Sequence, residues 1–143
     1  MKYIAYGSNL NIEQMERRCR TAMLFGISKL DGYRLVFRGD NASAVASVEK
    51  QKGSSVPVLV WEIQKEDELA LDRYEGYPYL YRKEKVKIDV AGIRTTGMMY
   101  VMNKGKKLAV PGRYYYEIIA QGYKEAGFDI DILKQAVANS CAG

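Results

Sequence analysis

Histidine is absent from this sequence of 143 residues. A Ser–His or Cys–His nucleophilic pair within one chain is therefore excluded, and so is a zinc site that uses histidine. The two cysteines, Cys19 and Cys141, lie far apart without the spacing of a metal or redox motif, so we expect free thiols in a reduced, cytoplasmic protein. An enzyme made from this chain has to move protons with a carboxylate, lysine, tyrosine or cysteine.

Long apolar runs are also missing, since no stretch approaches the length of a transmembrane helix. The segment Met1–Tyr6 is typical of a short strand and does not have the pattern of a signal peptide. The composition, with 48% hydrophobic and 27% charged residues, is that of a folded globular chain. We therefore expect one domain spanning residues 1–143 and no membrane partner.

Phenylalanine and tryptophan are scarce, whereas tyrosine is abundant: three, one and twelve residues, respectively. A tyrosine buries its ring and still offers a hydroxyl group, which suits a core that also lines a polar pocket. The net charge of +5 permits an anionic partner, but the lysines and arginines are scattered and form no long basic run. A solvated basic surface is therefore favoured over a nucleic-acid interface.

The hydrophobic pattern predicts that strands dominate the middle of the chain and helices its end, which is an α+β order. We expect strands at Lys2–Tyr6, Tyr33–Arg38, Ala44–Lys50, Val56–Ile63, Arg82–Val90 and Thr95–Met102. We expect helices from Asn11 as N-cap to Arg18, over Lys65–Tyr74 with Gly76 as C-cap, over Arg113–Ala126 and over Ile130–Ala138.

Two segments carry residues suited to chemistry. The first is Tyr6-Gly7-Ser8-Asn9-Leu10, a strand-to-helix turn whose backbone amides would form a cradle for an anion, or else an ordinary tight turn. The second contains Glu75, a carboxylate at the end of a predicted helix among tyrosines and a proline. Such surroundings would raise the pKa of the carboxyl group; the alternative is a surface glutamate paired with Arg73 or Arg82.

Three motifs in order resemble the γ-glutamylcyclotransferase family. They are Tyr-Gly-Ser-Asn-Leu at residues 6–10, Leu-Asp-x-x-Glu-Gly at residues 71–76 followed by Tyr81, and Pro-x-x-x-Tyr at residues 111–115 ahead of Ile118 and Ile119. The order and spacing of the motifs fit over nearly the whole chain, from Tyr3 to about Phe128. Each motif alone is weak, and their combination carries the resemblance.

The resemblance implies a compact mixed β-barrel of about six strands with surrounding α-helices. It implies that Glu75 is the catalytic acid/base, and that no metal or organic cofactor takes part. The substrate-binding residues that it implies are Tyr6, Gly7, Ser8, Asn9, Leu10, Tyr81 and Tyr115. Tyr115 shares a helix face with Ile118 and Ile119, so Tyr114 and Tyr116 are expected at the rim or on the surface.

The implied reaction cyclises a γ-glutamyl group to 5-oxoproline and releases the attached amine or amino acid. The expected partner is therefore a small γ-glutamyl substrate, with no nucleic acid, for a monomer or a homodimer. Two alternatives stay open. One is a protein of this fold that acts on γ-glutamyl amines or on a carrier-linked γ-glutamyl group. The other is a non-catalytic binding module.

Overall fold

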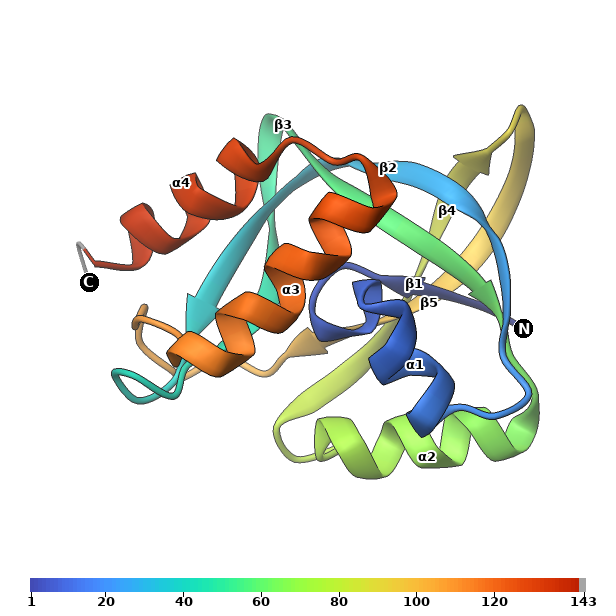
Figure 1. Cartoon of the computed structure of the whole chain (residues 1–143), viewed down its shortest axis with the longest axis horizontal. Helices are drawn as coiled ribbons and strands as arrows, with labels where there is room; N and C mark the ends of the chain where they lie inside the picture. The colour runs from blue at the N-terminus through green and yellow to red at the C-terminus, as the bar shows by residue number, and fades with distance from the viewer. Residues whose placement is uncertain (142–143) are drawn as a thin grey trace.

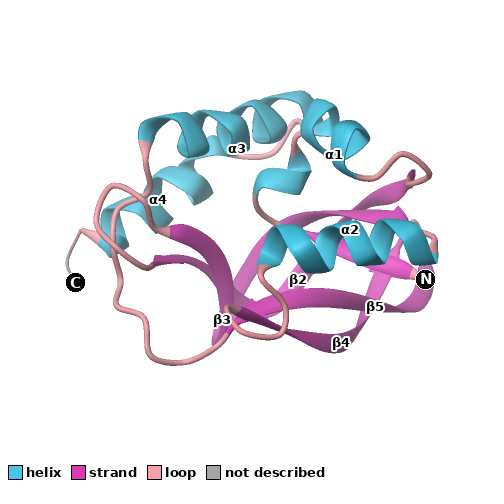
Figure 2. Ribbon diagram, turned by 90° about the horizontal axis from the view of Figure 1, so that it is seen from below, coloured by secondary structure: helices cyan, strands magenta, loops and turns pink. Residues whose placement is uncertain are grey.

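A mixed five-stranded sheet with helices on one side forms the framework of the protein (Figures 1 and 2). The computed structural model describes residues 1–141. The strands are β1 (Lys2–Ala5), β2 (Met23–Arg38), β3 (Val45–Glu62), β4 (Tyr81–Val90) and β5 (Ile93–Met102), in the order β2-β3-β1-β5-β4. The short β1 lies at the centre, antiparallel to β3 and parallel to β5.

Four α-helices and one 3₁₀ turn connect and cover these strands. They are η1 (Ser8–Leu10), α1 (Ile12–Arg18), α2 (Lys65–Glu75), α3 (Arg113–Ala126) and α4 (Ile130–Ser140). The caps follow the sequence: Asn11 accepts a hydrogen bond from the Gln14 amide, and Gly76 and Gly127 end their helices in the left-handed conformation. None of the helices within residues 1–141 has the length and hydrophobicity to span a membrane.

The α+β fold is as expected, but the sheet has five strands instead of about six. Ala44–Lys50 and Val56–Ile63, expected as separate strands, are the two ends of the single long strand β3. Their polar connection continues the hairpin with β2, and the pairing shifts register between Asp31 and Tyr33. Ladder hydrogen bonds join backbone groups, so a strand can continue through residues whose side chains show no strand pattern.

The curved sheet approaches a barrel without closing through a backbone ladder within the described residues. Its two edge strands, β2 and β4, come together where the Ser28 hydroxyl donates to the carbonyl oxygen of Asp89. The curvature brings the ends of α2, β4 and β5 close to the loop that follows β1. This convergence places residues from the whole length of the chain around one cavity.

Helix α3 packs directly against η1, and a glycine permits the close approach. A Cβ atom added at Gly122 would lie 2.7 Å from the carbonyl carbon of Leu10 and 2.9 Å from the amide nitrogen of Asn11. The Asn11 side chain also donates to the carbonyl oxygen of Ile118, at 3.1 Å. The loop after β1 therefore owes its position to α3.

We expect Gly122→Ala to lower the free energy of unfolding by about 1–3 kcal/mol, because backbone atoms on both sides resist displacement. Alanine would otherwise favour the helix by about 1 kcal/mol. Urea unfolding measures the difference. The control is Gln121→Ala at the neighbouring exposed position, which should change stability by less than about 0.5 kcal/mol. A Gly122→Ala protein as stable as the wild type would contradict this account of the packing.

Candidate active site

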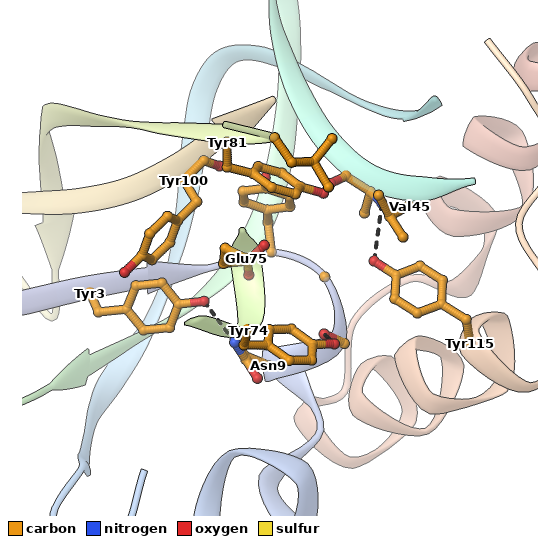
Figure 3. A pocket seen from close by; sticks show the side chains of 13 residues that line it. Tyr3, Asn9, Val45, Tyr74, Glu75, Tyr81, Tyr100 and Tyr115 are labelled. Carbon is orange, nitrogen blue, oxygen red and sulfur yellow. Dashed lines mark hydrogen bonds between the residues drawn. The ribbon is translucent and has the colours of Figure 1, made fainter. Parts of the chain in front are cut away.

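A cavity of about 220 Å³ lies where the loop after β1 meets the end of α2, β3, β4, β5 and α3 (Figure 3). Six tyrosine side chains line the cavity, and they come from six different segments of the chain, including the last turn of α2. The full lining is Tyr3, Tyr6, Gly7, Ser8, Asn9, Val45, Ala46, Tyr74, Glu75, Leu80, Tyr81, Tyr100 and Tyr115. The tyrosine rings therefore give the cavity an apolar surface, and their hydroxyl groups add polar atoms to it.

Seven of the eight site residues expected from the sequence line this cavity. They are Tyr6, Gly7, Ser8, Asn9, Glu75, Tyr81 and Tyr115. Leu10 does not: its side chain is fully buried beneath the loop, against α3 at Gly122, and its amide donates to the carbonyl oxygen of Gly7. Leu10 thus supports the loop from the core, which explains an apolar residue after four residues that face the cavity.

Glu75 is the last residue of α2, and its carboxylate lies at the centre of the lining residues in Figure 3. Gly76, with φ of +66°, ends the helix and turns the chain toward β4. Burial raises the pKa of the Glu75 carboxyl group from its usual 4.5 to about 7, and the positive charge of Arg18 opposes this rise. Within residues 1–141 no salt bridge involves Glu75, and Arg82 pairs with Glu84 instead.

Hydrogen bonds commit the protons of three tyrosines in the cavity wall. Tyr6 donates its hydroxyl proton to the carbonyl oxygen of Tyr100 at 2.5 Å, and Tyr81 donates to the carbonyl oxygen of Ala46 at 2.5 Å. Tyr100 donates to the carboxylate of Asp72 at 2.6 Å. Each of these hydroxyl oxygens can therefore only accept a hydrogen bond from a ligand.

Tyr115 has the opposite polarity. Its hydroxyl oxygen accepts the amide proton of Ala46 at 3.0 Å, so its own proton is free for a group in the cavity. The ring is in edge contact with Phe37, whereas Tyr114 is 74% exposed. Tyr115 is therefore directed to the cavity and Tyr114 to the surface, as expected from the sequence, whereas Tyr116 is half-buried and packs against the hydrophobic core.

The loop Gly7–Asn9 supplies further donors. The amides of Leu10 and Asn11 close the 3₁₀ turn by donating to the carbonyl oxygens of Gly7 and Ser8. The amides of Ser8 and Asn9 come before these two bonds and have no partner within the turn.

The cysteines and acidic residues within the described part of the chain do not gather in a group of three or more that could hold a metal ion.

Six further residues line the cavity without having been expected there from the sequence: Tyr3, Tyr74, Tyr100, Val45, Ala46 and Leu80. Tyr74 had a local signal, because it precedes Glu75 within the second motif. The high number of tyrosines was a general signal for a pocket of this kind, without naming its members. Tyr3 and Tyr100 face each other edge to face at 5.9 Å only because β1 and β5 are neighbours in the sheet.

Comparison with known proteins agrees with the fold and shows the family. A model of the family described as gamma-glutamyl cyclotransferase, AIG2-like, matches residues 3–122. The human protein named gamma-glutamylcyclotransferase is 29% identical over 138 residues, which cover 90% of this chain and 73% of that protein. The bovine protein of the same name is 26% identical over 142 residues, with coverages of 93% and 75%.

A solved structure named gamma-glutamyl cyclotransferase superimposes with a TM-score of 0.83 and 27% sequence identity. It covers 95% of this chain, which in turn covers 85% of that structure. The relatives and the solved structure together show an enzyme of the cyclotransferase class. The chain belongs to the gamma-glutamyl cyclotransferase, AIG2-like family. The family resemblance, the fold class and the expectation of an enzyme are thereby confirmed.

The raised pKa of Glu75 predicts a pH-dependent stability difference between the wild type and Glu75→Gln. Between pH 4.5 and about 7 the folded protein keeps a proton that the unfolded chain has lost, so wild-type stability falls as the pH rises through this range. Glutamine stays neutral at every pH. Glu75→Gln should therefore gain stability relative to the wild type, on the order of 2 kcal/mol, between pH 4.5 and pH 8.

Urea unfolding at the two pH values tests this expectation, with Glu66→Gln at an exposed position of α2 as the control. The control should differ from the wild type by the same small amount at both pH values. An equal difference at both pH values for Glu75→Gln as well would show that the Glu75 carboxylate is ionised in the folded protein without cost.

Proposed function

We propose that this protein cyclises the γ-glutamyl group of a small free substrate to 5-oxoproline, with Glu75 as general acid/base. The observation that carries the proposal is the half-buried Glu75 carboxyl group, with a pKa raised to about 7, in a cavity lined by tyrosine hydroxyl groups. A group with a pKa near neutrality both accepts and returns a proton efficiently at physiological pH. Membership of the family supports the reaction class.

Cyclisation requires the α-amine of the γ-glutamyl group to attack the γ-carbonyl carbon of the same molecule. The amine is a cation at neutral pH and has to lose a proton before the attack. We assign this proton to the Glu75 carboxylate, which then returns it to the departing amine nitrogen as the γ-amide bond breaks. The ring nitrogen loses a second proton to water once the new C–N bond has formed, and the released amine takes up one proton from water. Both reacting groups belong to one substrate, so a cavity that holds it folded supplies a high effective concentration.

The polarity of the cavity suits a group that carries both a cation and oxygen acceptors. The hydroxyl oxygens of Tyr6, Tyr81 and Tyr100 accept hydrogen bonds, as an ammonium group requires. The hydroxyl proton of Tyr115 and the amides of Ser8 and Asn9 provide donors for substrate oxygen atoms. We therefore assign Tyr6, Gly7, Ser8, Asn9, Tyr81 and Tyr115 to substrate binding.

We further propose that residues 1–143 form one domain and act in the cytoplasm on a small γ-glutamyl compound. The chemistry described uses only side chains and backbone groups of this chain. Incubation with a panel of γ-glutamyl dipeptides, glutathione and γ-glutamyl-lysine tests the reaction, with 5-oxoproline as the measured product. The substrate with the highest kcat/KM identifies the leaving amine. No 5-oxoproline from any member would contradict the proposed function.

Glu75→Gln should retain less than about a tenth of the wild-type kcat, because glutamine keeps the shape but carries no proton; general acid/base catalysis contributes about 10²–10⁴-fold. Release of 5-oxoproline from the best substrate of the panel is the measurement. Glu66→Gln, on the exposed side of the same helix, should have wild-type kcat. Wild-type kcat/KM should also rise with pH up to about 7, where the carboxylate becomes ionised. A Glu75→Gln protein with nearly full turnover would assign the proton to another group.

Tyr115→Phe should lower kcat/KM, which corresponds to a loss of about 1–3 kcal/mol of transition-state stabilisation. This is the usual effect of leaving a buried polar partner unpaired. The matched control is Tyr114→Phe, which removes the same atom from the exposed neighbour in α3 and should leave kcat/KM unchanged. Steady-state kinetics with one substrate gives both values. Loss of activity in Tyr114→Phe with an unimpaired Tyr115→Phe would place the substrate against a different face of α3.

A further inference from the structure

Three residues form a chain of hydrogen bonds from α1 to the wall of the cavity. The Arg18 guanidinium donates to Oδ1 of Asn9, and also to Oε1 of Gln14 at 3.3 Å. Nδ2 of Asn9 then donates to the hydroxyl oxygen of Tyr3 at 2.9 Å (Figure 3). Asn9 and Tyr3 are 2% and 4% exposed, so water does not compete freely for these bonds.

The direction of this chain is fixed by arginine, which has donors and no acceptor. Asn9 must present its amide oxygen to Arg18, and the amide nitrogen is thereby turned toward Tyr3. The nitrogen only donates, so the Tyr3 oxygen accepts. Among the hydrogen bonds of residues 1–141, this is the one that involves the Tyr3 hydroxyl group. Its own proton therefore remains available on the side of the cavity that Tyr3 lines.

This polarity distinguishes Tyr3 from most of the tyrosines around it. Tyr6, Tyr81 and Tyr100 donate hydrogen bonds to acceptors of the protein, whereas Tyr3 and Tyr115 each accept a hydrogen bond from the protein. Figure 3 shows the Tyr3 and Tyr115 rings entering from different sides of the cavity, with Glu75 between them. Burial also raises the pKa of Tyr3 well above its usual value, so the hydroxyl keeps its proton at every working pH.

Arg18 itself is held by stacking. The central carbon of its guanidinium lies 3.4 Å from the ring centre of Tyr74, and the Tyr74 hydroxyl is 2.8 Å from the Ser8 hydroxyl oxygen. A planar cation confined in this way has little freedom to release Asn9. Arg18 is not itself a lining residue, so its effect on the cavity has to pass through Asn9, through Tyr74 or through its charge.

We propose that Tyr3 is a catalytic residue that donates a hydrogen bond to an oxygen atom of the bound γ-glutamyl group. Arg18 is the positioning residue that, through Asn9, keeps Tyr3 a donor. The inference rests on the proposed function. The γ-glutamyl group presents carboxylate and carbonyl oxygens as acceptors, whereas its ammonium group can only donate and does not match the Tyr3 proton.

Tyr3→Phe should lower kcat/KM for 5-oxoproline formation by about 10- to 100-fold, because the ring remains and one donor is lost. The matched control is Tyr123→Phe. Tyr123 has a fully buried hydroxyl oxygen without a hydrogen-bond partner in the described structure, and it lies outside the cavity. Its loss should leave kcat/KM unchanged. A folded Tyr3→Phe enzyme with wild-type kcat/KM would overturn the proposal.

Two variants of Arg18 separate the positioning role from simple support. Lysine keeps the charge and only donates, so Asn9 stays oriented in Arg18→Lys. Glutamine both donates and accepts, so Asn9 loses its fixed orientation in Arg18→Gln. Arg18→Lys should keep at least several-fold more kcat/KM than Arg18→Gln. Equal losses would show that stacking on Tyr74 is the whole role of Arg18 and would overturn the positioning assignment.

Arg18→Lys and Arg18→Gln combined with Tyr3→Phe test whether Arg18 acts through the Tyr3 hydroxyl group. With no Tyr3 hydroxyl left to orient, Arg18→Lys and Arg18→Gln should have equal kcat/KM on the pH plateau. A difference that persists undiminished would show that Arg18 acts on another group. The charge effect is read separately: the acid limb of the pH profile should move to higher pH in Arg18→Gln, since Arg18 lowers the pKa of Glu75, and should stay in place in Arg18→Lys.

The activity of the wild type distinguishes a failure of the proposed function from a failure of the inference about Tyr3. A wild type that forms no 5-oxoproline from any γ-glutamyl compound contradicts the proposed function and the inference together. An active wild type with an unimpaired Tyr3→Phe variant contradicts the inference and leaves the proposed function standing.

Discussion

The half-buried carboxylate of Glu75, which forms no salt bridge within residues 1–141, is the constraint around which this structure is organised. Desolvation of Glu75 costs folding free energy at neutral pH, and only a rigid setting keeps the side chain in the cavity. Helix α2 provides that setting. Its first turn is held by the Asp67 carboxylate, which accepts from the Gln64 amide at 2.9 Å and the Thr21 hydroxyl at 2.6 Å. Its last turn is fixed by Asp72, which accepts a hydrogen bond from the Tyr100 hydroxyl and lies 2.9 Å from the Lys83 ammonium nitrogen.

The tyrosines around Glu75 explain how one cavity can be both desolvating and polar. Their rings exclude water and so raise the pKa of the carboxyl group, while their hydroxyl groups stay within reach of a ligand. Two backbone carbonyl groups and Asp72 make three of the hydroxyl groups donors. The Ala46 amide and the Asn9 side chain make the hydroxyl groups of Tyr115 and Tyr3 acceptors. Because these bonds exist before any ligand binds, the cavity does not have to reorient its dipoles during a reaction, which is the condition for efficient electrostatic catalysis.

Packing of the helices on the loop after β1 connects stability with the site. Gly122 allows α3 to touch Leu10, and Asn11 joins α1 to the carbonyl oxygen of Ile118. Ser8 and Asn9 belong to the loop that these contacts support, and Arg18 of α1 lies over the Tyr74 ring. Leu10, which the sequence motif suggested as a ligand contact, does not line the cavity and is packed beneath the loop instead.

The sequence by itself determined the local features of this protein. Asn11, Gly76 and Gly127 end or begin helices through bonds to residues within one turn, the β4–β5 hairpin closes at Ala91-Gly92, and Glu75 stands out as a carboxylate among tyrosines. The tertiary structure decided what depends on neighbours distant in the chain. The continuity of β3, the burial of Leu10, the meeting of Tyr3 with Tyr100 and the direction of each tyrosine hydroxyl all follow from pairing and packing between segments. Capping energies act over one helical turn, and a local pattern can reveal them. Hydrogen-bond polarity depends on which acceptor the fold brings within about 3 Å, and no local pattern contains that information.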